Sequence, residues 1–176
     1  MKHQMKIFGL FSQNLGNAHH QNRKTMERAN EIKISYKNNL KNKPKLKIQS
    51  SRDANKIIYD FWDKDHIELH ESFKVVYLNN NNVVKGICTM SIGGITATVV
   101  DIRLIFATAL KTLSTAIILT HNHPSGVVVP SDADKQLTKK IVKAGKLLDV
   151  KVLDHIIVTP HQSYFSFADE GLIRND

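Results

Sequence analysis

The chain has 176 residues, of which 41% are apolar and 23% charged, which fits a folded domain and excludes a wholly disordered or collagen-like chain. Its single cysteine, Cys88, excludes an intramolecular disulfide bond and a multi-cysteine zinc site. No apolar run approaches the roughly 18 residues that a membrane span needs, and the apolar run at residues 7–11 is shorter than a signal-peptide core. We therefore expect a cytoplasmic protein without a membrane partner.

The formal net charge of +9 comes entirely from residues 1–50, which contain 11 lysines and arginines but only 2 acidic residues. The segment is rich in Asn, Gln and His, and it carries lysines at alternate positions around Pro44. We predict a basic N-terminal arm, disordered or loosely attached, with one short strand at residues 31–36. Such an arm is either solvated or binds nucleic-acid phosphates weakly and without sequence specificity.

Residues 51–176 have a globular pattern. Helical spacing predicts a first helix over residues 51–62, capped by Ser51. Apolar strand signals then flank an Asn-rich turn and predict a hairpin of residues 73–78 and 83–90. Asp101 can cap a second helix, with apolar residues expected to face inward at these positions: Ile105, Ala109, Leu110 and Leu113.

A short strand is predicted at residues 115–120, followed by a loop and a third helix that opens at Ser131. The apolar stripe of this helix is expected to contain Leu137, Ile141, Ala144 and Leu148. Two final strands are predicted at residues 151–159 and 163–167. Alternating helices and strands predict an α/β (α+β) fold in which helices flank a mixed sheet.

The chemically informative segment follows the strand at residues 115–120. His121 and His123 are two residues apart in extended chain, so their imidazoles point to the same side and can share a metal ion. Pro124 and Gly126 turn the chain, which can bring Asp134, in the first helical turn, back to the histidines. Two nitrogens and one oxygen leave a fourth coordination position open, which is typical of a catalytic zinc site.

Each of these features also has a purely structural interpretation. Ser131 and Asp134 form a capping-box pattern that would stabilise the helix N-terminus, and a His-x-His pair in a loop is usually exposed. Their joint occurrence favours a metal site. The helical zinc-protease pattern His-Glu-x-x-His is absent, and one cysteine cannot complete the deaminase signature.

The spacing His121-x-His123, seven residues, Ser131-x-x-Asp134 resembles the JAMM motif of the JAB/MPN metallopeptidases, and most closely their RadC branch. The similarity extends over residues 50–175. It includes these further segments: Trp62, 71–73, 93–96, 116–126, 144–145, 153–155 and 167–172.

The resemblance implies a JAB/MPN-like mixed, curved sheet flanked by helices, over residues 51–176. It implies one zinc ion per chain, held by His121, His123 and Asp134. The family's general acid/base glutamate matches Glu71, just before the strand at residues 73–78, with Glu68 as a nearby alternative. Ser131 would donate a hydrogen bond to the developing oxyanion.

Three functions remain open at this stage. The first is a zinc-dependent hydrolase that cleaves a peptide or isopeptide bond in a peptide or protein substrate. The second is a DNA-associated accessory protein that uses the basic arm, although longer RadC proteins carry N-terminal helices resembling DNA-binding modules and residues 1–50 show no such pattern. The third is a catalytically silent JAB/MPN scaffold. Asp154 and His155 are expected to form a structural pair, with a role beside the metal as the alternative.

Overall fold

The computed structural model describes residues 44–93 and 99–174. Most of the predicted basic arm, including the strand expected at residues 31–36, lies outside the described residues. The described end of that segment contacts the domain. Ile48 is buried and its amide donates to the carbonyl of Asn82, while the amide of Val84 donates to the carbonyl of Leu46.

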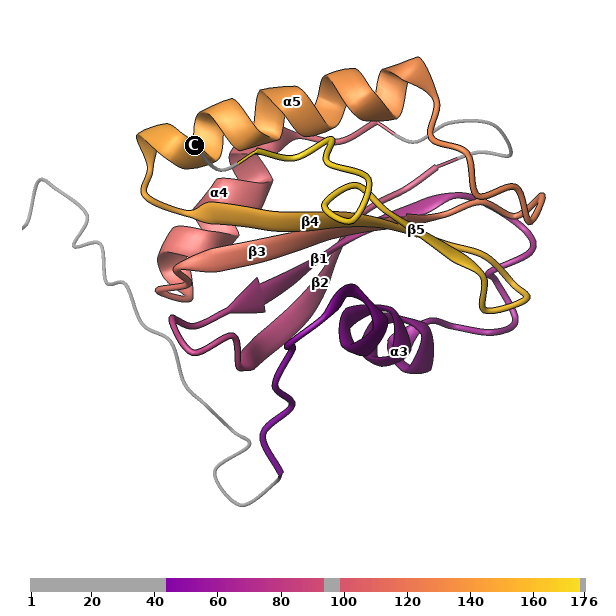
Figure 1. Ribbon diagram of the computed structural model, residues 1–176, viewed down its shortest axis with the longest axis horizontal. Helices are drawn as coiled ribbons and strands as arrows, with labels where there is room; N and C mark the ends of the chain where they lie inside the picture. Colours follow the sequence, from indigo (N-terminus) through magenta and orange to yellow (C-terminus); the bar gives the residue numbers. More distant parts are fainter. Residues whose placement is uncertain (1–43, 94–98, 175–176) are drawn as a thin grey trace, which may run out of the picture. The chain divides into compact units, whose positions relative to one another are not determined.

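The core of the domain is a five-stranded sheet in the order β2-β1-β3-β4-β5 (Figure 1). Its strands are β1 (Ser72–Leu78), β2 (Val84–Ile92), β3 (Ala116–Asn122), β4 (Lys151–Val158) and β5 (Tyr164–Ser166). All neighbouring strands are antiparallel except β3 and β4, which are parallel. The mixed sheet expected from the sequence is therefore confirmed.

Within residues 44–93 and 99–174, three helices cover the sheet: α3 (Ser51–Phe61), α4 (Ile102–Lys111) and α5 (Asp132–Leu147). Figure 1 shows α3 on one face and both α4 and α5 on the other. Because successive side chains of a strand point to opposite faces, β1 contributes to two hydrophobic cores. Phe73, Val75 and Tyr77 pack in the core with α4 and α5, whereas Val76 and Leu78 pack in the core with α3.

Several predicted details are wrong at the ends of elements. Ser50, rather than Ser51, is the N-cap of α3 and accepts a hydrogen bond from the amide of Asp53. Leu110 is half-exposed and Leu113 lies beyond the end of α4 with a positive φ, because the inward stripe of the helix runs through Ile105 and Ala109. Leu148 follows α5 and is also partly exposed.

One such difference affects the site. β3 continues two residues past the predicted end at residue 120, so His121 and Asn122 belong to the strand. His121 therefore shares the α5 face of the sheet with Ile117 and Leu119, while Asn122 points to the opposite face.

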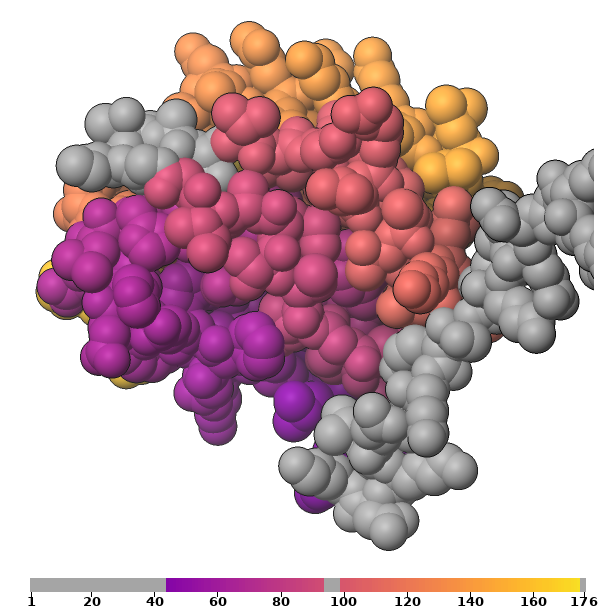
Figure 2. Space-filling model, turned by 180° about the vertical axis from the view of Figure 1, so that it is seen from behind, coloured from indigo at the N-terminus to yellow at the C-terminus, as the bar shows by residue number. Residues whose placement is uncertain are grey.

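Figure 2 shows the domain from behind the view of Figure 1. Residues of the edge strand β2 and of α4, coloured magenta to pink, are exposed on this side. Among the described residues, no helix combines the length and the apolar character needed to cross a membrane.

The packing of α5 against β4 gives a prediction about stability. A Cβ atom at Gly145 would lie 2.4 Å from the carbonyl oxygen of Val150, a backbone atom that cannot move without shifting β4. We expect Gly145→Ala to lower the free energy of unfolding by about 1–3 kcal/mol, the usual cost of overpacking, measured by urea denaturation. Gly86→Ala is the matched control, because no atom lies within 4 Å of its added Cβ. Equal stability of the two variants would contradict this packing.

Candidate metal centre

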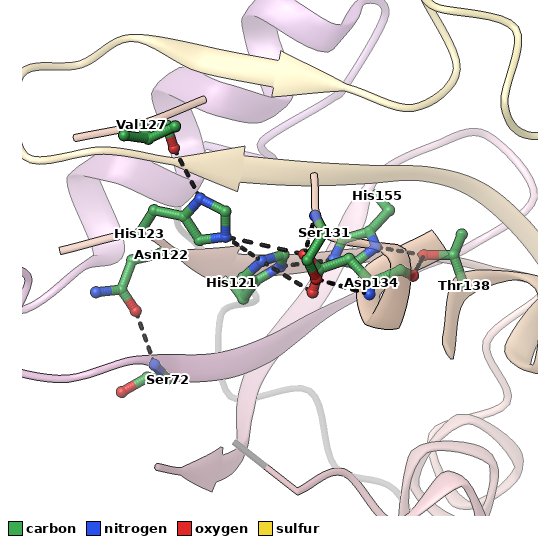
Figure 3. Close-up of polar contacts among 9 residues, drawn as sticks. All are labelled: Ser72, His121, Asn122, His123, Val127, Ser131, Asp134, Thr138 and His155. Carbon is green, nitrogen blue, oxygen red and sulfur yellow. Dashed lines mark hydrogen bonds and ion pairs between the residues drawn. The ribbon is translucent and has the colours of Figure 1, made fainter. Parts of the chain in front are cut away.

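The carboxyl end of β3 positions two histidines toward one cavity. His121 is the penultimate residue of the strand and is almost fully buried. His123 follows the strand, and its amide donates to the carbonyl of Val158 at 2.9 Å, which continues the pairing of β3 with β4. The two Nε2 atoms lie 3.0 Å apart (Figure 3). The expectation that an i, i+2 pair faces one side is thus met.

The N-terminus of α5 brings a carboxylate to the same place. Ser131 and Asp134 form the predicted capping box: the Asp134 amide donates to Ser131 Oγ, and the Ser131 amide donates to Asp134 Oδ2 at 2.8 Å. The Ser131 hydroxyl also donates to Oδ2, at 2.6 Å. These bonds hold the carboxylate of Asp134 with Oδ1 3.4 Å from His121 Nε2 and Oδ2 3.9 Å from His123 Nε2.

The separations of these side chains fit a single metal ion. The ligand atoms of His121, His123 and Asp134 lie within 4.8 Å of one another, so the three residues could hold a metal. Zinc binds nitrogen and oxygen at about 2.0–2.2 Å, so two of its ligand atoms can be up to about 4.2 Å apart. The two Nε2 atoms, 3.0 Å apart, and the pair of His121 Nε2 and Asp134 Oδ1, 3.4 Å apart, meet that limit, while His123 Nε2 lies 3.9 Å from the other carboxylate oxygen, Oδ2.

Hydrogen bonding supports the same assignment for His123. Its Nδ1 lies 2.7 Å from the carbonyl oxygen of Val127, which can only accept, so Nδ1 carries the hydrogen. In the neutral ring, Nε2 then presents a lone pair to the other two residues. A lone pair directed at a carboxylate and a second imidazole is an arrangement that a cation stabilises.

Burial keeps His121 neutral. Removal from water is the main cause that lowers its pKa to about 4, the negative charge of Asp134 raises it in part, and the charge of His123 lowers it further. The neutral imidazole is the form that binds a metal. His121 is therefore a competent ligand at neutral pH.

Glu71 lies at the same cavity, directly before β1. The cavity has a volume of about 500 Å³, and its walls include Glu71, both histidines, Ser131 and Asp134. Burial raises the pKa of Glu71; the charge of His123 lowers it and that of Asp134 raises it. Glu68, the alternative, is exposed and is not among the described residues that line this cavity.

Asn122 is a residue of the site that the sequence reasoning missed. It is fully buried, its Nδ2 donates to the carbonyls of Ile67 and His70, and its Oδ1 accepts from the amide of Ser72 at 2.7 Å. The bonds to the His70 carbonyl and from the Ser72 amide lie on either side of Glu71 and hold the backbone of that residue in place. The available signal was an amide at the end of an apolar strand, since a buried amide needs partners.

His155 corrects a prediction. Its ring does not contact the carboxylate of Asp154, which accepts from the His155 amide, the Ala168 amide and the Ser166 hydroxyl. The His155 ring lies instead 2.8 Å from Nδ1 of His121, between their nearest nitrogens. The position beside the candidate metal ligands, considered above as the alternative, is the one observed.

Comparison with known proteins agrees with this geometry. Residues 48–172 match the model of the RadC-like JAB domain, and the chain belongs to that family. It is 51% identical over 127 residues to a UPF0758 protein of Flavobacterium johnsoniae, which is 72% of this chain and 53% of the relative. It is 38% identical over 131 residues to a UPF0758 protein of Methanosarcina mazei, which is 74% of this chain and 56% of the relative. The chain thus spans about half the length of the curated relatives it matches.

The role of Asn122 gives a prediction. Asn122→Asp keeps an oxygen that can accept from the Ser72 amide. It replaces the side-chain NH₂ group, which donates to the carbonyls of Ile67 and His70, with a second oxygen, so both carbonyls lose a buried hydrogen-bond donor. We expect the free energy of unfolding to fall by at least about 1–3 kcal/mol, the cost of one unsatisfied buried group.

The measurement is urea denaturation at neutral pH. The exposed Asn80→Asp makes the same chemical change at the surface and should leave stability almost unchanged. An Asn122→Asp protein as stable as Asn80→Asp would show that this amide does not hold the segment around Glu71.

Proposed function

We propose that the protein is a zinc-dependent hydrolase that cleaves an amide bond, in a peptide or an isopeptide linkage. The observation that carries the proposal is the convergence of two imidazoles and a carboxylate, at distances suited to one ion, on a cavity that also contains a partly buried glutamate. Structural metal sites are usually closed by four protein ligands, and three ligands leave a position for reactants.

The donor set suits zinc, which takes imidazole nitrogen and carboxylate oxygen together. When bound, zinc supplies Lewis-acid chemistry, polarising a carbonyl group and making water acidic enough to react near neutral pH. His121, His123 and Asp134 would hold it.

Glu71 is proposed as the general acid and base. A carboxylate that is not a metal ligand can accept the proton of the attacking water and deliver it to the leaving amine nitrogen. Its raised pKa suits this exchange, because a base that is too acidic does not retain the proton that it must later donate.

Ser131 is proposed to stabilise the oxyanion. Its hydroxyl lies at the cavity and donates to Asp134 Oδ2. Rotation of the O–H bond about Cβ–Oγ would redirect the same hydrogen to a substrate oxygen, where one donor contributes about 2.7–4 kcal/mol to the transition state. The serine would then serve both as helix cap and as donor.

The walls of the cavity favour an amide substrate with an apolar side chain near the scissile bond. The described lining residues include neither lysine nor arginine, the usual partners of a phosphate group. The apolar members of the wall are Phe73, Val100, Val127, Val129, Ala133 and Leu137.

The proposal is tested first by metal content. Elemental analysis of the protein purified without added metal should give about one zinc per chain, the stoichiometry of a single mononuclear site. The double variant His121→Ala, His123→Ala should contain none, whereas His66→Ala, which removes an exposed histidine outside the site, should retain it. Full zinc content in the double variant would remove this site from consideration. The zinc protein, incubated with a peptide and isopeptide library, should cleave members that stay intact when a chelator is present.

A second test separates Glu71 from the ligands. Glu71→Gln keeps the size of the side chain but cannot accept a proton, so zinc should remain bound while hydrolysis falls by about 10²–10⁴-fold. Glu68→Gln is the matched control and should cleave at the wild-type rate. If Glu68→Gln is instead the inactive, zinc-containing variant, the general base has been assigned to the wrong glutamate.

A further inference from the structure

A buried chain of hydrogen bonds lies behind the candidate metal ligands. His121 Nδ1 lies 2.8 Å from His155 Nε2, and His155 Nδ1 lies 2.6 Å from Thr138 Oγ1. The Thr138 hydroxyl in turn lies 2.6 Å from the backbone carbonyl of Asp134 (Figure 3). His121, His155 and Thr138 are each at most 3% exposed, so solvent water does not substitute for these partners.

The bond from Thr138 to Asp134 decides which atoms donate and which accept in the whole series of hydrogen bonds. A carbonyl oxygen can only accept, so the single hydrogen of the Thr138 hydroxyl is directed to Asp134. The oxygen of Thr138 is then left to accept, and the only hydrogen available for its 2.6 Å contact with His155 is one on Nδ1. Without it, two lone pairs would face each other.

The His155 ring is fully buried, and among the described residues its two nitrogens contact His121 and Thr138 and no carboxylate, so nothing offsets a positive charge on it. It stacks on Phe167 with ring centres 4.7 Å apart and meets Phe73 edge-on at 5.6 Å. The adjacent carboxylate of Asp154 binds the His155 amide rather than its ring. A neutral imidazole with its hydrogen on Nδ1 accepts at Nε2, so His121 must donate from Nδ1.

We propose that His155 and Thr138 are positioning residues that hold His121 in the Nδ1–H tautomer, with the lone pair of Nε2 directed to the metal position. If donors and acceptors in this series were exchanged, His121 would carry its hydrogen on Nε2, 3.0 Å from His123 Nε2. That hydrogen would block the atom of His121 that is to bind the metal. Because the last of these hydrogen bonds ends on the backbone carbonyl of Asp134, they also link His121 to Asp134, through His155 of β4 and Thr138 of α5. The inference rests on the proposed metal-binding function for its purpose, but the tautomer itself can be measured without metal.

The first measurement is made on metal-free, ¹⁵N-labelled full-length protein at mildly alkaline pH, where unperturbed imidazoles are neutral. Two-bond ¹H–¹⁵N correlation spectra distinguish protonated from unprotonated ring nitrogens. We expect His121 and His155 both to carry hydrogen on Nδ1. A hydrogen on Nε2 of either ring in the wild-type protein would overturn the inference.

The second measurement uses a matched pair of variants. Thr138→Val keeps the shape but removes the oxygen that accepts from His155, so we expect zinc affinity to fall by about 10–100-fold, the usual effect of losing a partner behind a ligand. Thr138→Ser keeps the hydroxyl and should retain wild-type affinity and the wild-type tautomers. Circular dichroism checks that both are folded, and loss of affinity in both, or in neither, would overturn the inference.

The outcome is distinguishable from failure of the proposed function. If the wild-type protein takes up no zinc but shows hydrogen on Nδ1 of both rings, the metal-dependent hydrolase is wrong and the tautomer assignment stands. If it binds zinc with the other tautomer at His121, the metal site stands and the positioning role is wrong.

Discussion

The parallel pairing of β3 with β4 is the constraint on which the site depends. Two parallel neighbours need a crossover connection, which here contains α5. The chain must therefore leave the carboxyl end of β3 and enter the helix close by, so histidines that end a strand meet a carboxylate in the first turn of the next helix. The same crossover places Thr138 of α5 over His155 of β4. One topological requirement thus assembles the candidate ligands and the residues behind them.

Hydrogen bonds to neighbouring residues fix the orientation of each candidate ligand side chain. Val127 accepts from the far side of His123, Ser131 binds Asp134, and His155 contacts the far side of His121. The two histidine contacts use ring nitrogens that face away from the other ligands, whereas Ser131 binds Asp134 Oδ2 and leaves Oδ1 toward His121 Nε2. The atoms that do face one another, Nε2 of both histidines and Oδ1 of Asp134, are consequently acceptors. A cation is a partner that could satisfy them together.

The opposite face of the sheet has its own part in the site. Asn122 follows His121 in β3 and therefore points away from the cavity, toward the segment that leads into β1. Its amide binds that segment on both sides of Glu71, while the amide of Gly93 binds the carbonyl of Glu71 at 2.8 Å. The position of the candidate acid/base is thus tied to the same strand as the two histidines. A change in β3 would move both.

Much of this could be predicted from the sequence, because local rules act over short distances. Period-two and helical spacing identified the elements, Asp101 and Ser131 mark helix starts, and His121, His123 and Asp134 lie within 14 residues of one another. What the sequence could not decide involves residues far apart in the chain. The partners of Asn122 lie 50 to 55 residues away, and His155 lies 34 residues from His121, so only the register of β1, β3 and β4 decides that they meet. The pairing of the Asp154 and His155 side chains was predicted wrongly for a different reason: adjacent residues of a strand point to opposite faces of the sheet and therefore find different partners.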